Sequence, residues 1–350
     1  MKSFHYHKNF KKKSQIHKRI LIVGGAGYIG SVLTDNLLKN GYSVRSLDLF
    51  LYKNNECALN FLGSTNYEFL YGDCTDRSFI KKSLEGVGCV LILAGLVGDP
   101  ISKKYPKESA LINDKGVKNV IDLCAENNIE KLIYVSTCSN YGLIESDDLA
   151  DEEYALNPLS LYAKTKVNAE KYILSLKGKT GMNPTILRFA TAFGLSPRMR
   201  FDLTVSEFTR ELALGKELLV YDVDTWRPYC HILDFARLIQ MVIEAETEIV
   251  SFEVFNAGGN INNATKQTVV NTILEQIPDG KVRYKDRGDD PRNYRVSFEK
   301  VKLVLGFEPK YTLQYGIEEL LNAMNNHVFD NVDENKNFYG NYEIHYPLRS

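Results

Sequence analysis

Short apolar runs alternate with longer amphipathic stretches through the first half of the chain. The runs at 20–23, 89–93 and 131–135 are almost uninterrupted, which is typical of strands buried on both faces of a parallel sheet. The stretches between them carry residues that begin and end helices. We therefore predict an α/β fold with a doubly wound parallel sheet. Its predicted strands lie at 20–23, 43–47, 67–71, 89–93, 131–135 and 185–189, and its main helices at 31–40, 77–84, 108–127 and 160–176.

A glycine-rich turn follows the first predicted strand. Gly24, Gly27 and Gly30 recur at three-residue intervals, and the amphipathic stretch after them ends at Gly41. In a strand-to-helix turn the first glycine permits the tight bend and the second lets a diphosphate approach the backbone. The third lets the helix pack closely on the strand. A pyrophosphate would then lie at the helix N-terminus, where free N–H groups favour negative charge.

The second predicted strand delivers Asp48, about 20 residues beyond the glycines, where Rossmann-type domains place an acid against the adenosine ribose. Its carboxylate can accept hydrogen bonds from both ribose hydroxyls and would repel a 2′-phosphate. The pattern therefore predicts a Rossmann-type domain that binds NAD rather than NADP.

Two later strand ends also point toward the cofactor. Asp73 follows the third predicted strand, where its side chain or neighbouring amides could meet adenine; alternatively, Asp73 caps the next helix. The sequence leaves both roles open. The fourth predicted strand ends in a loop of small residues, Ala94 and Gly95 among them, which suits a backbone passing close to a cofactor.

The pattern divides the chain into four parts. Residues 1–19 form a basic, apolar-poor leader for which disorder is expected, and residues 20–189 form the NAD-binding domain. Residues 190–326 have longer charged loops and are predicted to form a smaller, partly discontinuous substrate lobe across a cleft. The aromatic tail, 327–350, is expected to pack on the body or a neighbouring subunit rather than bind ligand.

Composition and charge narrow the class of protein without changing this fold. The formal net charge of −1 gives no electrostatic reason to expect a nucleic acid partner. No apolar run approaches the ~18 residues of a membrane span, and no signal-peptide pattern is seen. The six cysteines are scattered without a Cys-x-x-Cys pair, so neither a metal site nor disulfides are expected. We expect a cytoplasmic enzyme.

Two candidate catalytic residues follow the fifth predicted strand. Tyr162 and Lys166 are four residues apart and therefore share one face of the predicted helix. A phenol with a pKa near ~10 is a poor base at neutral pH, but a neighbouring ammonium stabilises its phenolate. Such a pair could take the proton of a sugar hydroxyl while a nicotinamide takes the hydride.

Taken together, these motifs resemble the extended short-chain dehydrogenase/reductase family, in its NAD-dependent sugar-nucleotide epimerase/dehydratase branch. The likeness runs from about residue 19 to residue 315. The residues that carry it are Gly24 to Gly30, Gly72-Asp73, Tyr141-Gly142, Tyr162 with Lys166, Arg188, Phe193-Gly194, and Arg227-Pro228-Tyr229 with His231 and Asp234.

The resemblance implies catalytic roles for Thr137, Tyr162 and Lys166. Thr137 would hydrogen-bond the reacting oxygen, and Lys166 would also hold the nicotinamide ribose. Together with the glycine pattern it implies cofactor contacts at Gly24, Gly27, Tyr28, Ile29, Gly30, Asp48, Asp73, Cys74, Leu93, Ala94, Gly95, Tyr162 and Lys166.

The resemblance also implies a nucleotide-diphosphate sugar as substrate. Arg227 matches an arginine that binds the substrate's diphosphate, a role suited to a guanidinium. Thr137, Ser139 and Asn140 are further candidate substrate contacts. Arg200 and Arg292 either bind substrate or form surface salt bridges. Relatives dimerise through two helices, so a homodimer formed by the helices at 108–127 and around Tyr162 is expected.

The residues after Thr137 bear on the reaction. The 4,6-dehydratases of this family carry an Asp-Glu pair there, and a 3,5-epimerising relative carries a Cys at the second of these positions; this chain has Cys138 and Ser139. Both reactions are therefore disfavoured. What remains is oxidation at C4 to a 4-keto sugar, by a C4 dehydrogenase or a 4-epimerase.

Two other classes stay open. One is an NAD(H)-dependent reductase of a 4-keto sugar or a small carbonyl compound. The other is a non-catalytic NAD-binding regulator, although regulators usually lose Tyr or Lys and both are present here. The runs at 93–100 and 292–297 resemble enzymes of surface-polysaccharide sugar biosynthesis, including C4 dehydrogenases of GDP-heptose.

Overall fold

The computed structural model describes residues 18–144, 148–286, 288, 290 and 292–346. The predicted disordered leader lies outside the described residues except for Lys18 and Arg19, and Arg19 already begins the first strand. The last four residues of the predicted tail, 347–350, also lie outside them.

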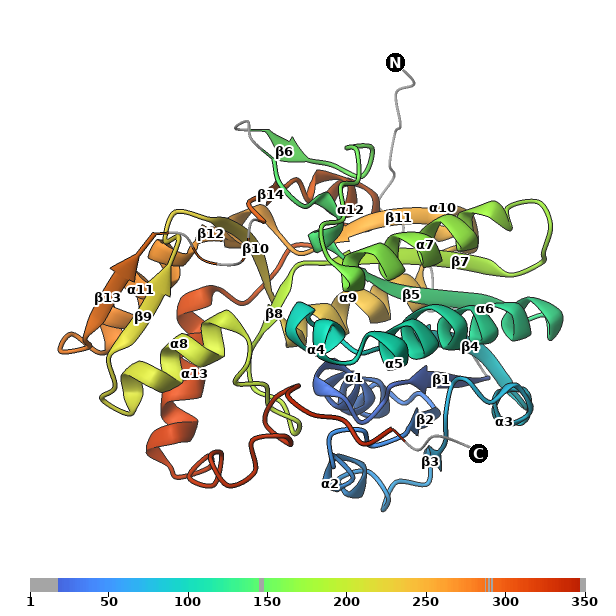
Figure 1. The fold of residues 1–350 in the computed structure, drawn as a ribbon. Helices are drawn as coiled ribbons and strands as arrows, with labels where there is room; N and C mark the ends of the chain where they lie inside the picture. The colour runs from blue at the N-terminus through green and yellow to red at the C-terminus, as the bar shows by residue number, and fades with distance from the viewer. Residues whose placement is uncertain (1–17, 145–147, 287, 289, 291, 347–350) are drawn as a thin grey trace.

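Within the described residues, the larger part of the molecule is built on a seven-stranded parallel sheet (Figure 1). The strand order is β11-β7-β5-β4-β1-β2-β3, so the chain reverses direction of progress between β1 and β4. This confirms the predicted α/β fold with a Rossmann-type sheet. The strands are β1 (Arg19–Val23), β2 (Val44–Asp48), β3 (Tyr67–Tyr71), β4 (Val87–Ile92), β5 (Lys131–Thr137), β7 (Asn183–Phe189) and β11 (Glu253–Ala257).

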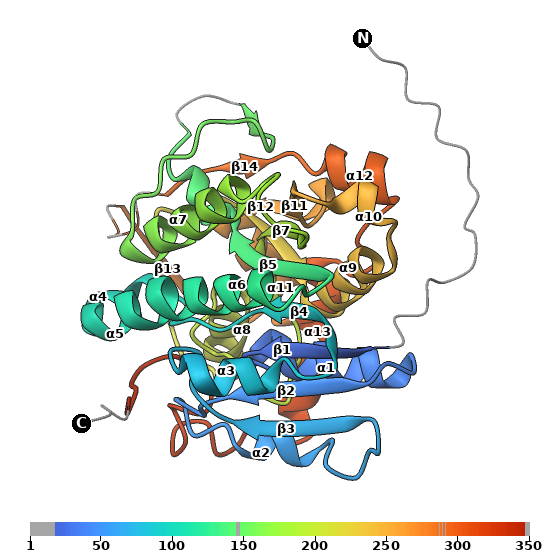
Figure 2. The same cartoon turned by 90° about the vertical axis from the view of Figure 1, so that its right-hand side faces the viewer.

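The sheet is covered on both faces, which explains its apolar strands. Alternate residues of β1 point to opposite sides: Ile20 and Ile22 join one hydrophobic cluster, and Leu21 and Val23 join another. α1 (Tyr28–Lys39) and α9 (Ile232–Glu244) supply the first cluster. The helical elements on the other face are α3 (Arg77–Ser83), α4 (Asp99–Lys104), α5 (Pro106–Ala110), the π-helix η1 (Leu111–Gly116), α6 (Val117–Glu126) and α7 (Leu161–Ser175), as Figure 2 shows.

The predicted helix at 108–127 differs in detail from the observed one. It begins two residues earlier, at Pro106, and contains a π-helical segment. Asn113 in that segment accepts a hydrogen bond from Leu96 N at 2.7 Å and donates one to Leu96 O at 3.1 Å. The sequence does not predict α4. The predicted loop after β4 ends at Gly98, and α4 begins at Asp99 with Pro100 in its first turn, where the missing N–H of a proline is tolerated.

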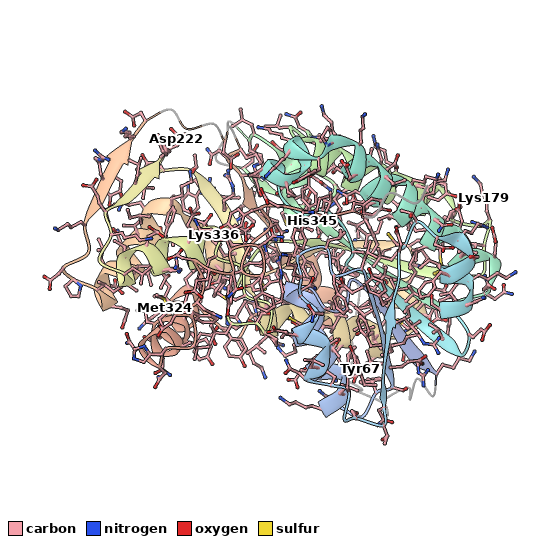
Figure 3. The ribbon with its side chains drawn as sticks, turned by 60° about the horizontal axis from the view of Figure 1, so that its bottom comes forward. Tyr67, Lys179, Asp222, Met324, Lys336 and His345 are labelled. Carbon is pink, nitrogen blue, oxygen red and sulfur yellow. The ribbon has the colours of Figure 1, made fainter. Side chains whose placement is uncertain are left out.

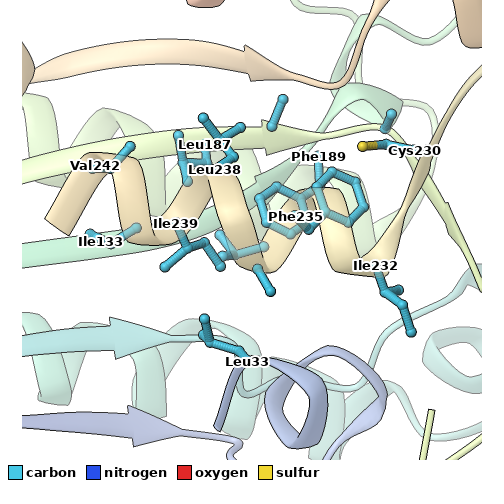
Figure 4. Packing of buried hydrophobic residues seen from close by; sticks show 14 of the residues in the cluster. Leu33, Ile133, Leu187, Phe189, Cys230, Ile232, Phe235, Leu238, Ile239 and Val242 are labelled. Atoms are coloured by element: carbon cyan, nitrogen blue, oxygen red, sulfur yellow. The ribbon is translucent and has the colours of Figure 1, made fainter. Parts of the chain in front are cut away.

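Residues after β7 build a smaller lobe and also return to the sheet. α9 packs on α1, and β11 adds a strand beside β7. Figure 4 shows Phe235 of α9 stacked on Phe189 of β7, with ring centroids 3.8 Å apart. The division at residue 189 stays a prediction; the structure adds that a segment beyond it completes the sheet and its covering layer.

The smaller lobe contains three helices and several short strands among the described residues. α8 (Thr204–Ala213), α11 (Lys266–Gln276) and α13 (Leu313–Asn325) enclose a third hydrophobic cluster. In Figure 3, Asp222 and Met324 mark this lobe, and Tyr67 marks the edge strand β3 of the large sheet. Its strands are β8 (Thr191–Phe193), β9 (Leu218–Tyr221), β10 (Trp226–His231), β12 (Asn263–Thr265) and β13 (Val282–Lys285).

Short elements complete the chain. The strands β6 (Leu149–Ala150) and β14 (Arg295–Val296) pair in parallel. The remaining helical elements are α2 (Glu56–Leu59), α10 (Thr247–Val250), α12 (Glu299–Leu305) and the 3₁₀ turns η2 (Cys138–Tyr141) and η3 (Asn260–Asn262). In the described part of the chain, no helix has both the length and the apolar character that crossing a membrane requires.

Candidate active site

A large cavity lies between the carboxyl ends of the sheet strands and the smaller lobe. Val23, Asp48, Leu93 and Ser136 line it from the ends of β1, β2, β4 and β5. A doubly wound sheet has its ligand crevice at this edge, where the strand order reverses. Of the predicted site residues, the cavity is lined by Gly24, Gly27, Tyr28, Ile29, Gly30, Asp48, Asp73, Cys74, Leu93, Ala94, Gly95, Thr137, Ser139, Tyr162, Lys166, Arg200, Arg227 and Arg292.

The glycine turn forms a cradle that side chains would fill. Gly24 has φ of +93°, and a Cβ added there would lie 2.7 Å from Ala94 N on the neighbouring strand's loop. A Cβ on Gly30 would lie 2.3 Å from Gly24 O. Gly27 caps α1 without a side chain, so the first N–H groups of the helix face the cavity. These residues therefore fit the diphosphate of a dinucleotide.

The two acids at the ends of β2 and β3 are held by backbone groups. Asp48 accepts hydrogen bonds from Ala26 N at 3.0 Å and Phe50 N at 2.9 Å, which fixes its carboxylate beside the glycine turn. Burial raises the pKa of Asp48, and these two N–H groups oppose the shift. Asp73 accepts from Thr75 N at 2.8 Å and does not cap α3, whose N-cap is Asp76. The alternative role as a helix cap is therefore excluded for Asp73.

The predicted catalytic residues Thr137, Tyr162 and Lys166 all line the cavity. Ser160 caps α7 and so sets the start of the helix, whose inward face carries Tyr162 and Lys166. Lys166 Nζ donates to Val135 O at 2.7 Å and lies 5.8 Å from the centre of the Tyr162 ring. Thr137 Oγ1 accepts from Ser139 N at 3.1 Å, which leaves its hydroxyl proton available for donation.

Burial dominates the proton affinities of this group. It raises the pKa of Tyr162, and Arg200 is the strongest of the charges that oppose the shift. Burial also lowers the pKa of Lys166 to about 8, with Glu170 opposing. The expectation that Lys166 lowers the pKa of Tyr162 is therefore not met in the chain alone, because burial of the phenol outweighs the neighbouring charges.

Three predicted arginines, which we call the arginine cluster, line the cavity. Arg227 Nη2 is 3.0 Å from Asp290 Oδ2, and Arg292 Nη2 is 2.7 Å from the same oxygen. Burial works against the charge of Asp290, but Arg292 and Arg227 outweigh it and hold its pKa below the usual range. Arg200 is bound by both carboxylate oxygens of Asp202. All three predicted arginines are thus paired within the cavity wall rather than on the outer surface.

Asn140 is the one predicted site residue that does not line the cavity. It is fully buried, and its amide donates to Ser136 Oγ and Glu170 Oε1. Glu170 in turn pairs with Arg188 at 2.8 Å. Asn140 therefore belongs to a buried polar network behind the site and not to its surface.

Several cavity residues escaped sequence reasoning. Lys266 begins α11, Asp290 and Tyr294 lie in the segment before β14, and Asn341 and Tyr346 come from the tail. None lies in a motif, and only the folded chain brings them together. Tyr294 lies in the run at 292–297, and the resemblance of that run is its one signal in the sequence.

The chain matches the family model described as "NAD dependent epimerase/dehydratase family" over residues 20–258. It is 28% identical over 318 residues to a putative UDP-glucose 4-epimerase of Methanocaldococcus jannaschii, covering 88% of this chain and 98% of the relative. It resembles the crystal structure of UDP-glucose 4-epimerase with UDP-glucose from Thermotoga maritima. That match has a TM-score of 0.79 and 25% identity, and covers 89% of this chain and 99% of that one.

A third likeness is to dTDP-glucose 4,6-dehydratase from Bacillus anthracis in complex with NAD. The TM-score is 0.78 and the identity 25%, with 89% of this chain and 98% of that chain covered. The sheet and its cavity thus define an NAD-dependent enzyme of the short-chain dehydrogenase/reductase type. The chain belongs to the NAD-dependent epimerase/dehydratase family.

Proposed function

We propose that this enzyme oxidises C4 of a nucleotide-linked sugar, as a 4-epimerase or a C4 dehydrogenase. The observation that supports this best is that Tyr162, Lys166 and Thr137 line the same cavity as the glycine cradle and the arginine cluster. A hydroxyl-bearing carbon held between these walls would have a proton acceptor and a dinucleotide site within one enclosed space.

The arginine wall suits a diphosphate substrate. The charges of Arg227 and Arg292 are matched by Asp290, which both contact, and by Asp99, 3.2 Å from Arg292. Binding of a second anion therefore depends on the N–H donors of the guanidinium groups and on further positive charge in the cavity. Lys266 adds a further positive charge to the same cavity. A nucleotide sugar carries such a diphosphate, and relatives are named for UDP-glucose and dTDP-glucose.

The chain's own residues divide the chemistry among them. NAD, when bound, accepts a hydride from the sugar carbon and can return it. Tyr162 takes the hydroxyl proton, Thr137 donates a hydrogen bond to the same oxygen, and Lys166 holds the nicotinamide ribose. Because burial raises the pKa of Tyr162, the proton transfer depends on positive charge at the site.

Dehydration is disfavoured by the groups next to Thr137. Loss of water needs an acid and a base beside the sugar ring. The two positions after Thr137 hold the thiol of Cys138 and the hydroxyl of Ser139. Cys138 is 1% exposed, its thiol donates to Arg188 O at 3.1 Å, and burial raises its pKa far above the ordinary value. Cys138 is thus a buried neutral group outside the cavity.

We extend the proposal to the cell and the assembly. A role in surface-polysaccharide sugar biosynthesis, in the cytoplasm, rests on the resemblance of the runs at 93–100 and 292–297. A homodimer would use α6 and α7, which pack beside each other on one face of the sheet. Sedimentation at micromolar concentration should show a dimer, and a monomer alone would contradict that part.

The test of the function is direct. Ligands released from the purified protein are identified by mass spectrometry, and the protein is then incubated with UDP-, GDP-, CDP- and dTDP-sugars. We expect bound NAD and one sugar nucleotide converted to its C4 epimer or 4-keto form. Absorbance at 340 nm separates the two, because only net oxidation accumulates reduced cofactor. Conversion of small carbonyl compounds without any nucleotide sugar would contradict the proposal.

A further inference from the structure

The C-terminal segment joins the two parts of the molecule across the cofactor cavity. Arg198 Nη2 donates to Gly340 O at 3.0 Å, and Asn341 N donates to Asp202 Oδ2 at 3.2 Å, both from the wall of the smaller lobe. Asn341 Nδ2 then donates to Val97 O at 2.9 Å, in the loop after β4. Figure 1 shows this dark red segment running from the smaller lobe toward β2 and β3.

The next residues anchor the segment on the sheet side. Lys104 of α4 binds Tyr342 O at 3.2 Å and Glu343 at 3.0 Å. Ile344 is 6% exposed and joins the hydrophobic cluster that contains Leu96. A buried anchor flanked by hydrogen bonds on both sides holds this segment in one place.

Tyr346 ends the described segment at the carboxyl end of β3. Its hydroxyl donates to Asp73 Oδ2 at 2.5 Å and lies 3.1 Å from Thr75 Oγ1. Burial and the hydrogen bond to Asp73 raise the pKa of Tyr346 to about 12, so the hydroxyl keeps its proton at neutral pH. Asp73 is thereby held from both sides, by Thr75 N on Oδ1 and by Tyr346 on Oδ2.

We propose that Tyr346 is a cofactor-positioning residue: it fixes Asp73 at the adenine end of the dinucleotide site, and its segment covers that end. Asp73, Cys74 and Tyr346 all line the cavity, at the strand next to the one that carries Asp48. The proposal rests on NAD binding and not on the identity of the sugar. Tyr346 and its segment thereby slow the dissociation of the adenosine half of NAD from the enzyme.

Three variants of the full-length enzyme test this. Tyr346→Phe removes only the hydroxyl. Tyr284→Phe is the matched control, since its exposed hydroxyl accepts one bond from Gln267 and neither residue lines the cavity. Asp73→Asn completes a double-mutant cycle with Tyr346→Phe. The readouts are the NADH dissociation rate by stopped-flow fluorescence and the affinities for ADP-ribose, nicotinamide mononucleotide and UDP.

We expect Tyr346→Phe to speed NADH dissociation and to weaken the binding of ADP-ribose, each about tenfold. This is the effect of losing one hydrogen bond to a charged group. Nicotinamide mononucleotide and UDP should bind as in the wild type, as should all four probes in Tyr284→Phe. The double variant with Asp73→Asn should be little worse than Asp73→Asn alone. NADH dissociation within twofold of wild type in Tyr346→Phe, or an equal loss for UDP, would overturn the proposal and leave the C4 chemistry untouched.

Discussion

The cofactor side and the substrate side of the cavity are built in different ways. On the cofactor side, the glycine turn and the acid of β2 come from one continuous stretch of chain, Arg19 to Asp48. On the substrate side, Arg200, Arg227 and Arg292 come from separate loops and strands. Asp290 contacts both Arg227 and Arg292, and Asp202 pairs with Arg200. The first is a local design and the second an assembled one.

The difference has a physical cause. A diphosphate on the cofactor side is bound by backbone N–H groups, whose positions follow from a short strand-turn-helix unit. The diphosphate that we propose for the substrate side would be bound by guanidinium groups, whose charges must be kept apart by carboxylates from elsewhere in the chain. We therefore expect cofactor-side changes to act through backbone geometry and substrate-side changes to act through charge.

The largest effect should come from Tyr162, which lines the cavity shared by the cofactor side and the substrate side. Tyr162→Phe keeps the ring that fills the site and removes the proton acceptor, so turnover should fall about 1,000-fold while NAD affinity stays within a few-fold. Steady-state rates and fluorescence titration measure the two. Near-normal turnover in this variant would remove Tyr162 from the mechanism.

The substrate side is tested by Arg227→Ala, which removes one of the two guanidinium groups on Asp290. The Michaelis constant for the nucleotide sugar should rise about 100-fold with NAD affinity unchanged, since a charged hydrogen bond to the diphosphate is lost. Arg283→Ala is the control, because Arg283 pairs with Glu217 on the outer surface of β13. An unchanged Michaelis constant would reject the nucleotide-sugar substrate.

The cofactor side is tested by Gly30→Ala. The added Cβ would meet Gly24 O at 2.3 Å and the backbone of Gly25 at 2.9 Å, so the cradle must shift. We expect the unfolding free energy to drop by about 2 kcal/mol and NAD binding to weaken with it. Gly63→Ala adds the same methyl in open space and should change neither. Equal denaturation curves for the two variants would show that the cradle has room to spare.

The smallest effect concerns pH. The pKa of Lys166 in the folded chain is about 8, below the ~10.4 of an unfolded lysine, because burial disfavours its charge. The unfolded state therefore binds more protons between these values, and this residue's contribution to stability improves as pH rises. Relative to Lys166→Met, the wild type should gain just under ~2 kcal/mol from pH 7.5 to 9.5 in urea unfolding. Parallel curves would mean that Lys166 titrates normally.

The same contrast explains what could be predicted from the sequence. The strands, the glycine turn and the pair Tyr162 and Lys166 follow from local periodicity and spacing, and the structure places them at the cavity. Lys266, Asp290 and Tyr346 could not be found in this way, because only long-range packing brings them to the site. Asn140 shows the opposite error: its position next to Ser139 suggested the cavity, but the 3₁₀ turn after β5 directs it into the buried network of Glu170.

In the proposed reaction, the bond between C4 of the sugar and its hydrogen is broken. The most direct measurement is a single turnover of the identified sugar nucleotide carrying deuterium at C4, with the quenched cofactor and product analysed by mass spectrometry. We expect deuterium on the cofactor during the reaction and a turnover about two- to fivefold slower if this step limits the rate. Turnover at the unlabelled rate, with deuterium never reaching the cofactor, would contradict oxidation at C4.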